Sequence, residues 1–123
     1  MVFLIIDDDE FKIEMVENLL TEHTIAITKS YNSGMRTILA GGIDGIILDM
    51  GFPRWDDNTE IRNDMGLDVL FEMKRHKINI PVIIHSGNYF DVKEFNNVID
   101  YVMVGREEHL QRAISNLIKK CEK

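Results

Sequence analysis

The chain has 123 residues, of which 45% are hydrophobic and 28% charged, a composition typical of one globular domain spanning residues 1–123. Its net charge of −7 argues against direct binding to nucleic acid, because phosphate backbones are bound by clustered lysines and arginines. A single cysteine, Cys121, and an apolar stretch at Val2–Ile6 that is too short for a signal peptide or a membrane span favour a cytoplasmic protein with no membrane partner.

The first half of the chain alternates between strand-like and helix-like patterns. Val2–Ile6 is the first predicted strand, and Thr24–Thr28 is the second. The helix between them begins near Asp9, a candidate cap, and its inward residues are predicted to be Phe11, Met15 or Val16, Leu19 and Leu20. The next helix, capped by Asn32 or Ser33 and ending at Gly41, is predicted to carry Met35, Ile38 and Leu39 inward.

The second half continues the alternation. Strands are predicted before Asp49, before Ser86 and at Tyr101–Val104, with a short helix at 92–97 between the last two. A helix opening at Gly66 is predicted to point Leu67, Leu70, Phe71 and Met73 inward, and the last helix has an apolar stripe of Leu110, Ala113, Ile114, Leu117 and Ile118. This (βα)5 order predicts an α/β fold of the flavodoxin-like kind, a doubly wound five-stranded parallel sheet with helices on both faces.

Three of these apolar runs end in side chains that carry oxygen. Residues 3–6 run into Asp7, Asp8 and Asp9, residues 45–48 run into Asp49, and residues 81–85 run into Ser86. Because the carboxyl ends of parallel strands meet at one edge of the sheet, these groups should gather there. Carboxylates so close repel one another, which makes a site for a divalent cation and a phosphoryl group the economical interpretation.

Four segments in order, FLIIDDD, GIILDMGFP, PVIIHSG and Asp100-Tyr101-Val102, resemble the receiver domain of two-component response regulators over essentially the whole chain. The resemblance implies that Asp7 and Asp8 form the acidic pair and that Asp49 is the phosphoacceptor. It also implies that Ser86 donates a hydrogen bond to the phosphoryl group, with space left by Gly87, and that Tyr101 is the conformational switch.

Such a site would hold Mg²⁺ (or Mn²⁺) by Asp8, Asp49, the backbone carbonyl of Gly51 and a water bound by Asp7. Its expected partners are a histidine kinase or a phosphotransfer protein upstream and a protein target downstream. A homodimer is left open.

Two features depart from the family pattern. The family has a lysine three residues after the switch aromatic, followed by proline, whereas this chain has Val104 and Gly105. Arg106 or Arg54 could reach in as a replacement, although each is more readily a surface arginine. The second departure is an insertion at Arg54–Met65 containing Trp55, which is either a docking or lid element beside the site or a polar surface loop.

The sequence therefore predicts a stand-alone phosphorelay receiver, favoured by the Met1 start and the complete final helix, with no enzymatic activity beyond slow autophosphorylation and autodephosphorylation. One alternative is a pseudo-receiver, an interaction module without efficient phosphoryl chemistry, which Val104 favours. A less favoured alternative is a phosphatase of the haloacid-dehalogenase kind, with Asp7 as nucleophile and Asp9 as acid/base.

Overall fold

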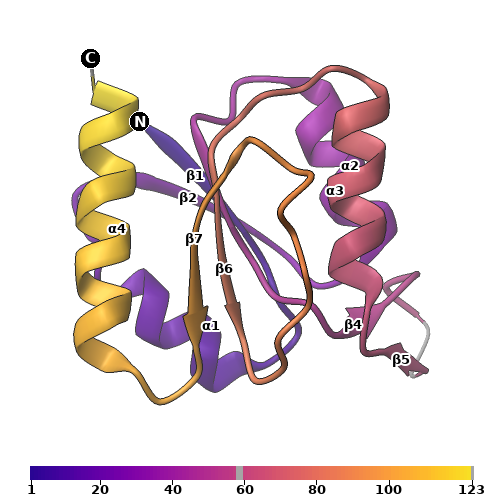
Figure 1. Cartoon of the computed structure of the whole chain (residues 1–123), viewed down its shortest axis with the longest axis horizontal. Coiled ribbons are helices and arrows are strands. Elements are labelled where there is room, and N and C mark those ends of the chain that lie inside the picture. Colours follow the sequence, from indigo (N-terminus) through magenta and orange to yellow (C-terminus); the bar gives the residue numbers. More distant parts are fainter. Residues whose placement is uncertain (58–59, 123) are drawn as a thin grey trace.

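The computed structural model describes residues 1–57 and 60–122 (Figure 1). Its five-stranded sheet has the order β2-β1-β3-β6-β7, and every neighbouring pair is parallel. The strands are β1 (Val2–Ile6), β2 (Thr24–Thr28), β3 (Gly45–Leu48), β6 (Val82–Ser86) and β7 (Val98–Met103). The helices found in the described residues are α1 (Glu10–Glu17), α2 (Tyr31–Ala40), α3 (Met65–Arg75) and α4 (Glu107–Glu122).

The helices cover both faces of this sheet, as the sequence predicted: α2 and α3 lie on one face, and α1 and α4 lie on the other (Figure 1). Each face has its own apolar core. Met35, Val69 and Leu70 belong to the first core, and Val16 and Ile114 to the second. The central strands are buried on both sides, which explains why their sequences are unbroken apolar runs. None of the described helices combines the length and the apolar character that crossing a membrane requires.

The inserted segment is part of a small antiparallel hairpin at the edge of the molecule. The first strand of the hairpin, β4 (Phe52–Pro53), directly precedes the insertion and is buried, and the second, β5 (Ile61–Arg62), lies within the insertion and is exposed. The predicted insertion, 54–65, includes residues 58–59, which lie outside the described residues.

The short helix predicted at 92–97 is wrong, because this described segment forms turns instead. A helix of so few residues is marginal unless tertiary contacts support it. Here a side chain forms a hydrogen bond to the backbone that stabilises a turn instead. The Asp91 carboxylate accepts a hydrogen bond from the backbone N–H of Lys93. The described residues therefore contain one helix fewer than the (βα)5 pattern implies.

Three smaller predictions are also corrected. The cap of α2 is Ser30, whose Oγ accepts a hydrogen bond from the Ser33 N–H at 3.1 Å, rather than Asn32 or Ser33. Phe11, Leu39 and Phe71 were predicted to point inward, but each is about half exposed or more. The last strand ends at Met103, so Val104 lies just beyond it.

Candidate functional site

The acidic residues lie at the carboxyl ends of the two central strands. Ile6 of β1 pairs with Leu48 of β3, so the next residues, Asp7 and Asp49, leave the sheet side by side. One carboxylate oxygen from each of Asp7, Asp8 and Asp49 lies within 4.8 Å of the other two. Asp7 and Asp49 are buried, and Asp8 is partly exposed. The structure thus brings together three of the four aspartates that the sequence predicted to gather, while Asp9 is outside this group.

Backbone N–H groups orient these carboxylates. The N–H of Met50 donates to Asp49 Oδ1 at 2.8 Å, and the N–H of Asp9 donates to Asp7 Oδ1 at 3.0 Å. Asp9 itself caps α1, since its carboxylate accepts from the N–H groups of Phe11 and Lys12. The consecutive aspartates therefore have different roles: Asp9 caps the helix, while Asp7 belongs to the carboxylate cluster.

Close packing of α3 against the end of β3 places Asp49. The first turn of α3 contains Gly66, whose N–H donates to the Met50 carbonyl at 2.9 Å. A Cβ at Gly66 would lie 2.5 Å from the Asp49 carbonyl oxygen and 2.9 Å from the Met50 Cα. Any larger residue would therefore push the phosphoacceptor candidate out of place, which gives the helix-opening glycine a structural reason.

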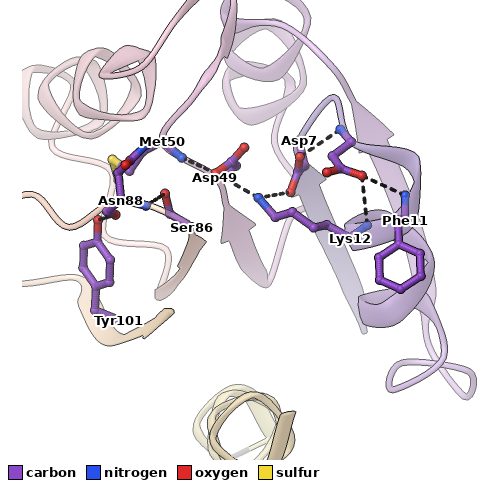
Figure 2. Close-up of polar contacts among 9 residues, drawn as sticks. Asp7, Phe11, Lys12, Asp49, Met50, Ser86, Asn88 and Tyr101 are labelled. Carbon is purple, nitrogen blue, oxygen red and sulfur yellow. Dashed lines mark hydrogen bonds and ion pairs between the residues drawn. The ribbon is translucent and has the colours of Figure 1, made fainter. Parts of the chain in front are cut away.

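Lys12 of α1 reaches into the cluster, a role that the sequence interpretation missed. Its ammonium lies 3.0 Å from Asp7 Oδ2 and 2.9 Å from Asp49 Oδ1, and the residue is only 8% exposed (Figure 2). The miss came from placing Phe11 on the inward face of the helix, whereas Phe11 is 73% exposed. A usable signal was present: side chains in the first turn of a helix point back toward its N-terminus, here toward the acids that end β1.

Burial and charge together perturb the cluster. The pKa of Asp7 is raised to about 7, first by burial and then by repulsion from Asp49, although Lys12 acts in the opposite direction. Burial also raises the pKa of Asp8. For Lys12, burial lowers the pKa, but attraction to Asp7 and Asp49 outweighs burial, so the net shift is upward. One ammonium thus stands among three carboxyl groups, and the cluster keeps an affinity for further positive charge.

An open cavity of about 340 Å³ lies beside Asp49 and Lys12. Its lining includes Lys12, Asp49, Gly51, Ser86, Gly87 and Val104. Ser86 is almost fully buried, and its Oγ accepts a hydrogen bond from the Asn88 N–H at 3.2 Å. A Cβ built on Gly87 would meet nothing within 4 Å, so there is free space at this position. The cavity is large enough for a phosphoryl group beside Asp49.

The inserted hairpin forms one wall of the same cavity through Ile61 and Asn63. Trp55, in contrast, is 48% exposed and is not among the described residues that line the cavity. The hairpin thus lies beside the site, whereas the docking or lid role considered for the insertion stays a prediction.

Tyr101, on β7, is linked to Ser86 through the loop that follows β6 (Figure 2). Its hydroxyl donates to the Asn88 carbonyl at 2.5 Å and accepts from the Phe90 N–H at 3.0 Å, and its ring packs at a tilt against Tyr89. Asn88 therefore contacts both Ser86 and Tyr101. The switch role of Tyr101 stays a prediction, but hydrogen bonds through Asn88 connect Tyr101 to Ser86.

Neither arginine considered as a substitute for the missing lysine lines the cavity among the described residues. The guanidinium of Arg54 lies over the Tyr31 ring, 4.8 Å from its centroid. Arg106 lines a separate surface hollow with Glu107 and His109. The cationic side chain that does line the cavity beside Asp49, among the residues the structure describes, is Lys12.

The donor set fits a hard divalent cation. Mg²⁺ and Mn²⁺ prefer carboxylate, carbonyl and water oxygens, and three aspartate oxygens within 4.8 Å of one another supply the first of these. Gly51 lines the cavity beside Asp49, where its carbonyl is the predicted fourth ligand.

No protein-family model matches the sequence, and no curated protein matches it. Solved structures match the fold. The Mn²⁺-bound form of response regulator Rcp1 is 20% identical, with a TM-score of 0.73 over 93% of this chain and 91% of that chain. The signal receiver domain of a putative Luxo repressor protein from Vibrio parahaemolyticus is 18% identical, with a TM-score of 0.76 over 98% and 92%.

Response regulator TrrA from Thermotoga maritima, solved in complex with Mg²⁺-BeF, is 20% identical, with a TM-score of 0.72 over 94% of this chain and 97% of that chain. At these identities the likeness concerns the fold. The fold of this chain is that of a response regulator receiver domain.

Proposed function

We propose that residues 1–123 act as a receiver domain that accepts a phosphoryl group on Asp49 from a histidine kinase or a phosphotransfer protein. The observation that carries the proposal is the convergence of Asp7, Asp8 and Asp49, whose oxygens lie within 4.8 Å of one another. Of the three, Asp49 lines a cavity that Ser86 also lines. Clustered buried carboxylates are costly, and a bound cation with a phosphoryl group gives them a use.

The residues would divide the work as follows. Asp8, Asp49, the Gly51 carbonyl and a water held by Asp7 would bind Mg²⁺ or Mn²⁺, which supplies positive charge against the phosphoryl oxygens. Asp49 would attack phosphorus, and the Ser86 hydroxyl would donate to a phosphoryl oxygen. The existing contacts of Asn88 with Ser86 and Tyr101 would pass a movement of Ser86 to the surface near β7.

In this proposal the output is a protein–protein contact on the side of β6, β7 and α4, and the chain is a cytoplasmic signalling module. It needs no enzymatic activity beyond its own slow phosphorylation and dephosphorylation. A homodimer is compatible with this output.

A second candidate is a pseudo-receiver that binds partners without being phosphorylated. Val104, which offers neither charge nor a hydrogen-bond donor at the cavity, favours it. The ion pairs of Lys12 with Asp7 and Asp49 also favour the pseudo-receiver, because they already neutralise part of the charge that a metal ion would bind. The two candidates differ in one measurable property, which is whether Asp49 becomes modified.

The test is to incubate the full chain with Mg²⁺ and acetyl phosphate and to locate the phosphoryl group by mass spectrometry. We expect label on Asp49, and none after Asp49→Asn. The matched control is Asp9→Asn, which keeps a capping side chain on α1 and should label as the wild type does. Label on Asp7 would indicate phosphatase-like chemistry, and no label at all would favour the pseudo-receiver.

A further inference from the structure

Lys12 is a buried cation whose position the fold has to stabilise. Burying an unpaired ammonium is costly, so Lys12 is tolerated because it contacts Asp7 and Asp49 at 3.0 Å and 2.9 Å. Its helix also carries apolar residues, Ile13 and Val16, into the core on the same side of the sheet. The ammonium is therefore held against Asp49 by the packing of α1.

Lys12 also supplies positive charge to the cavity beside Asp49. Among the described residues that line it, Lys12 is the one cationic side chain. Other cations near the site are paired elsewhere: Lys29 with Glu10, and Arg62 with Asp64 and Asp68. A dianionic group attached to Asp49 would find its nearest protein cation in Lys12.

Resting on the proposed function, we propose that Lys12 is a catalytic residue that binds a phosphoryl oxygen during transfer to Asp49. The Asp49 Oδ2 attacks phosphorus, an O–P bond forms, and the bond from phosphorus to the donor breaks. With acetyl phosphate the donor leaves as acetate with the bonding electron pair, so no proton has to move. The Lys12 ammonium, already beside Asp49, exchanges a carboxylate contact for a charge-assisted hydrogen bond to the incoming oxygen.

The experiment compares the rate of Asp49 labelling by acetyl phosphate in four proteins: wild type, Lys12→Met, the double variant Lys12→Met with Val104→Lys, and Lys29→Met. Removing one electrostatic donor from such a site slows transfer by about 100-fold or more, so we expect that loss in Lys12→Met. Val104 lies at the same cavity, so a lysine there should return about tenfold of the rate. Lys29→Met removes an exposed cation near the same helix and should label as the wild type does.

Mn²⁺ affinity, measured from the paramagnetic resonance signal of free Mn²⁺, gives a readout that does not depend on transfer. We expect Lys12→Met to bind Mn²⁺ several-fold more tightly than the wild type, because the competing ammonium has left Asp7 and Asp49. A misfolded variant would instead lose Mn²⁺ binding and labelling together. Tighter Mn²⁺ binding with slower labelling is therefore specific to the proposed role.

The results that overturn the proposal are equally definite. Labelling of Lys12→Met within about threefold of the wild-type rate would reject the role of Lys12 and leave the proposed function standing. A double variant no faster than Lys12→Met, with both still binding Mn²⁺, would assign Lys12 a structural role. Absence of label on the wild-type Asp49 would reject the proposed function itself, and this inference with it.

Discussion

His85 is an ionisable side chain buried within the sheet, on the strand next to the one that carries Asp49. It is 2% exposed, and its Nδ1 has no hydrogen-bond partner among the described residues. Its pKa is lowered to about 4, first because burial disfavours the imidazolium and then because Lys12 repels it, while Asp49 acts in the opposite direction. The folded protein therefore keeps His85 neutral at a pH where the unfolded chain protonates it.

This difference predicts acid sensitivity. Since the unfolded chain takes up a proton below about pH 6.5 and the folded protein does so near pH 4, the unfolding free energy should fall as the pH is lowered between these values, by roughly 3 kcal/mol at most. His85→Leu should remove this component, measured by urea unfolding from pH 4 to 7. The raised pKa of Asp7 makes the unfolding free energy rise as the pH is lowered, both in the wild type and in His85→Leu. The difference between the pH profiles of these two proteins therefore isolates the contribution of His85. An unchanged profile in His85→Leu would contradict the assignment.

The connection between β6 and β7 shows how an element without regular structure is held in place. Phe95 is 4% exposed, and its ring meets that of Phe71 edge to face at 4.9 Å. The Asn97 side chain donates to the Ile80 carbonyl, and Tyr101 accepts from the Phe90 N–H. One buried aromatic ring and a few side-chain hydrogen bonds therefore replace the helix that the sequence predicted.

A segment that depends on one anchor should be sensitive to its loss. Phe95→Ala should lower the unfolding free energy by about 3–5 kcal/mol, because it leaves a cavity in the core. Phe11→Ala is the matched control: it removes the same ring from a position on α1 that is 73% exposed and should cost well under half as much. Urea denaturation of both variants measures the difference. Equal losses would mean that Phe95 does not anchor the segment.

At the scale of the whole molecule, we expect the unfolding free energy to depend on bound cations, because the net charge is −7 and three carboxyl groups converge at one site. A ligand that binds the folded protein alone adds RT ln(1 + [L]/Kd) to the unfolding free energy. Mg²⁺ also screens surface charge, so its specific effect has to be separated from ionic strength.

We therefore expect Mg²⁺ at about ten times its Kd to raise the unfolding free energy by ~1.4 kcal/mol. The measurement is chemical denaturation with and without MgCl₂, with NaCl at the same ionic strength as the reference. Asp8→Asn should lose the increase while remaining folded, since Asp8 is partly exposed. The same Mg²⁺ effect in wild type and Asp8→Asn would argue against the proposed ligand set.

Local pattern was sufficient to predict most of the fold. Unbroken apolar runs such as Phe3–Ile6 indicate strands buried on both faces, and such strands belong to parallel sheets, so the five-stranded sheet with helices on both faces could be predicted and is confirmed. The gathering of Asp7 and Asp49 followed from the same reasoning, because parallel strands end at a common edge. Their chemical roles stay predictions.

The rest was decided by tertiary contacts. Hydrophobic periodicity predicts that a lysine lies at the surface, so it could not predict the burial of Lys12. Lys12 is buried because it contacts two carboxylates, Asp7 and Asp49, which follow the ends of two different strands. Nor could it reject the helix at 92–97, where the alternative is set by the burial of Phe95 against α3. The sequence by itself determined the sheet and the edge where its acids meet. Long-range charge pairing and packing, which local spacing does not encode, decided which cation lies among those acids.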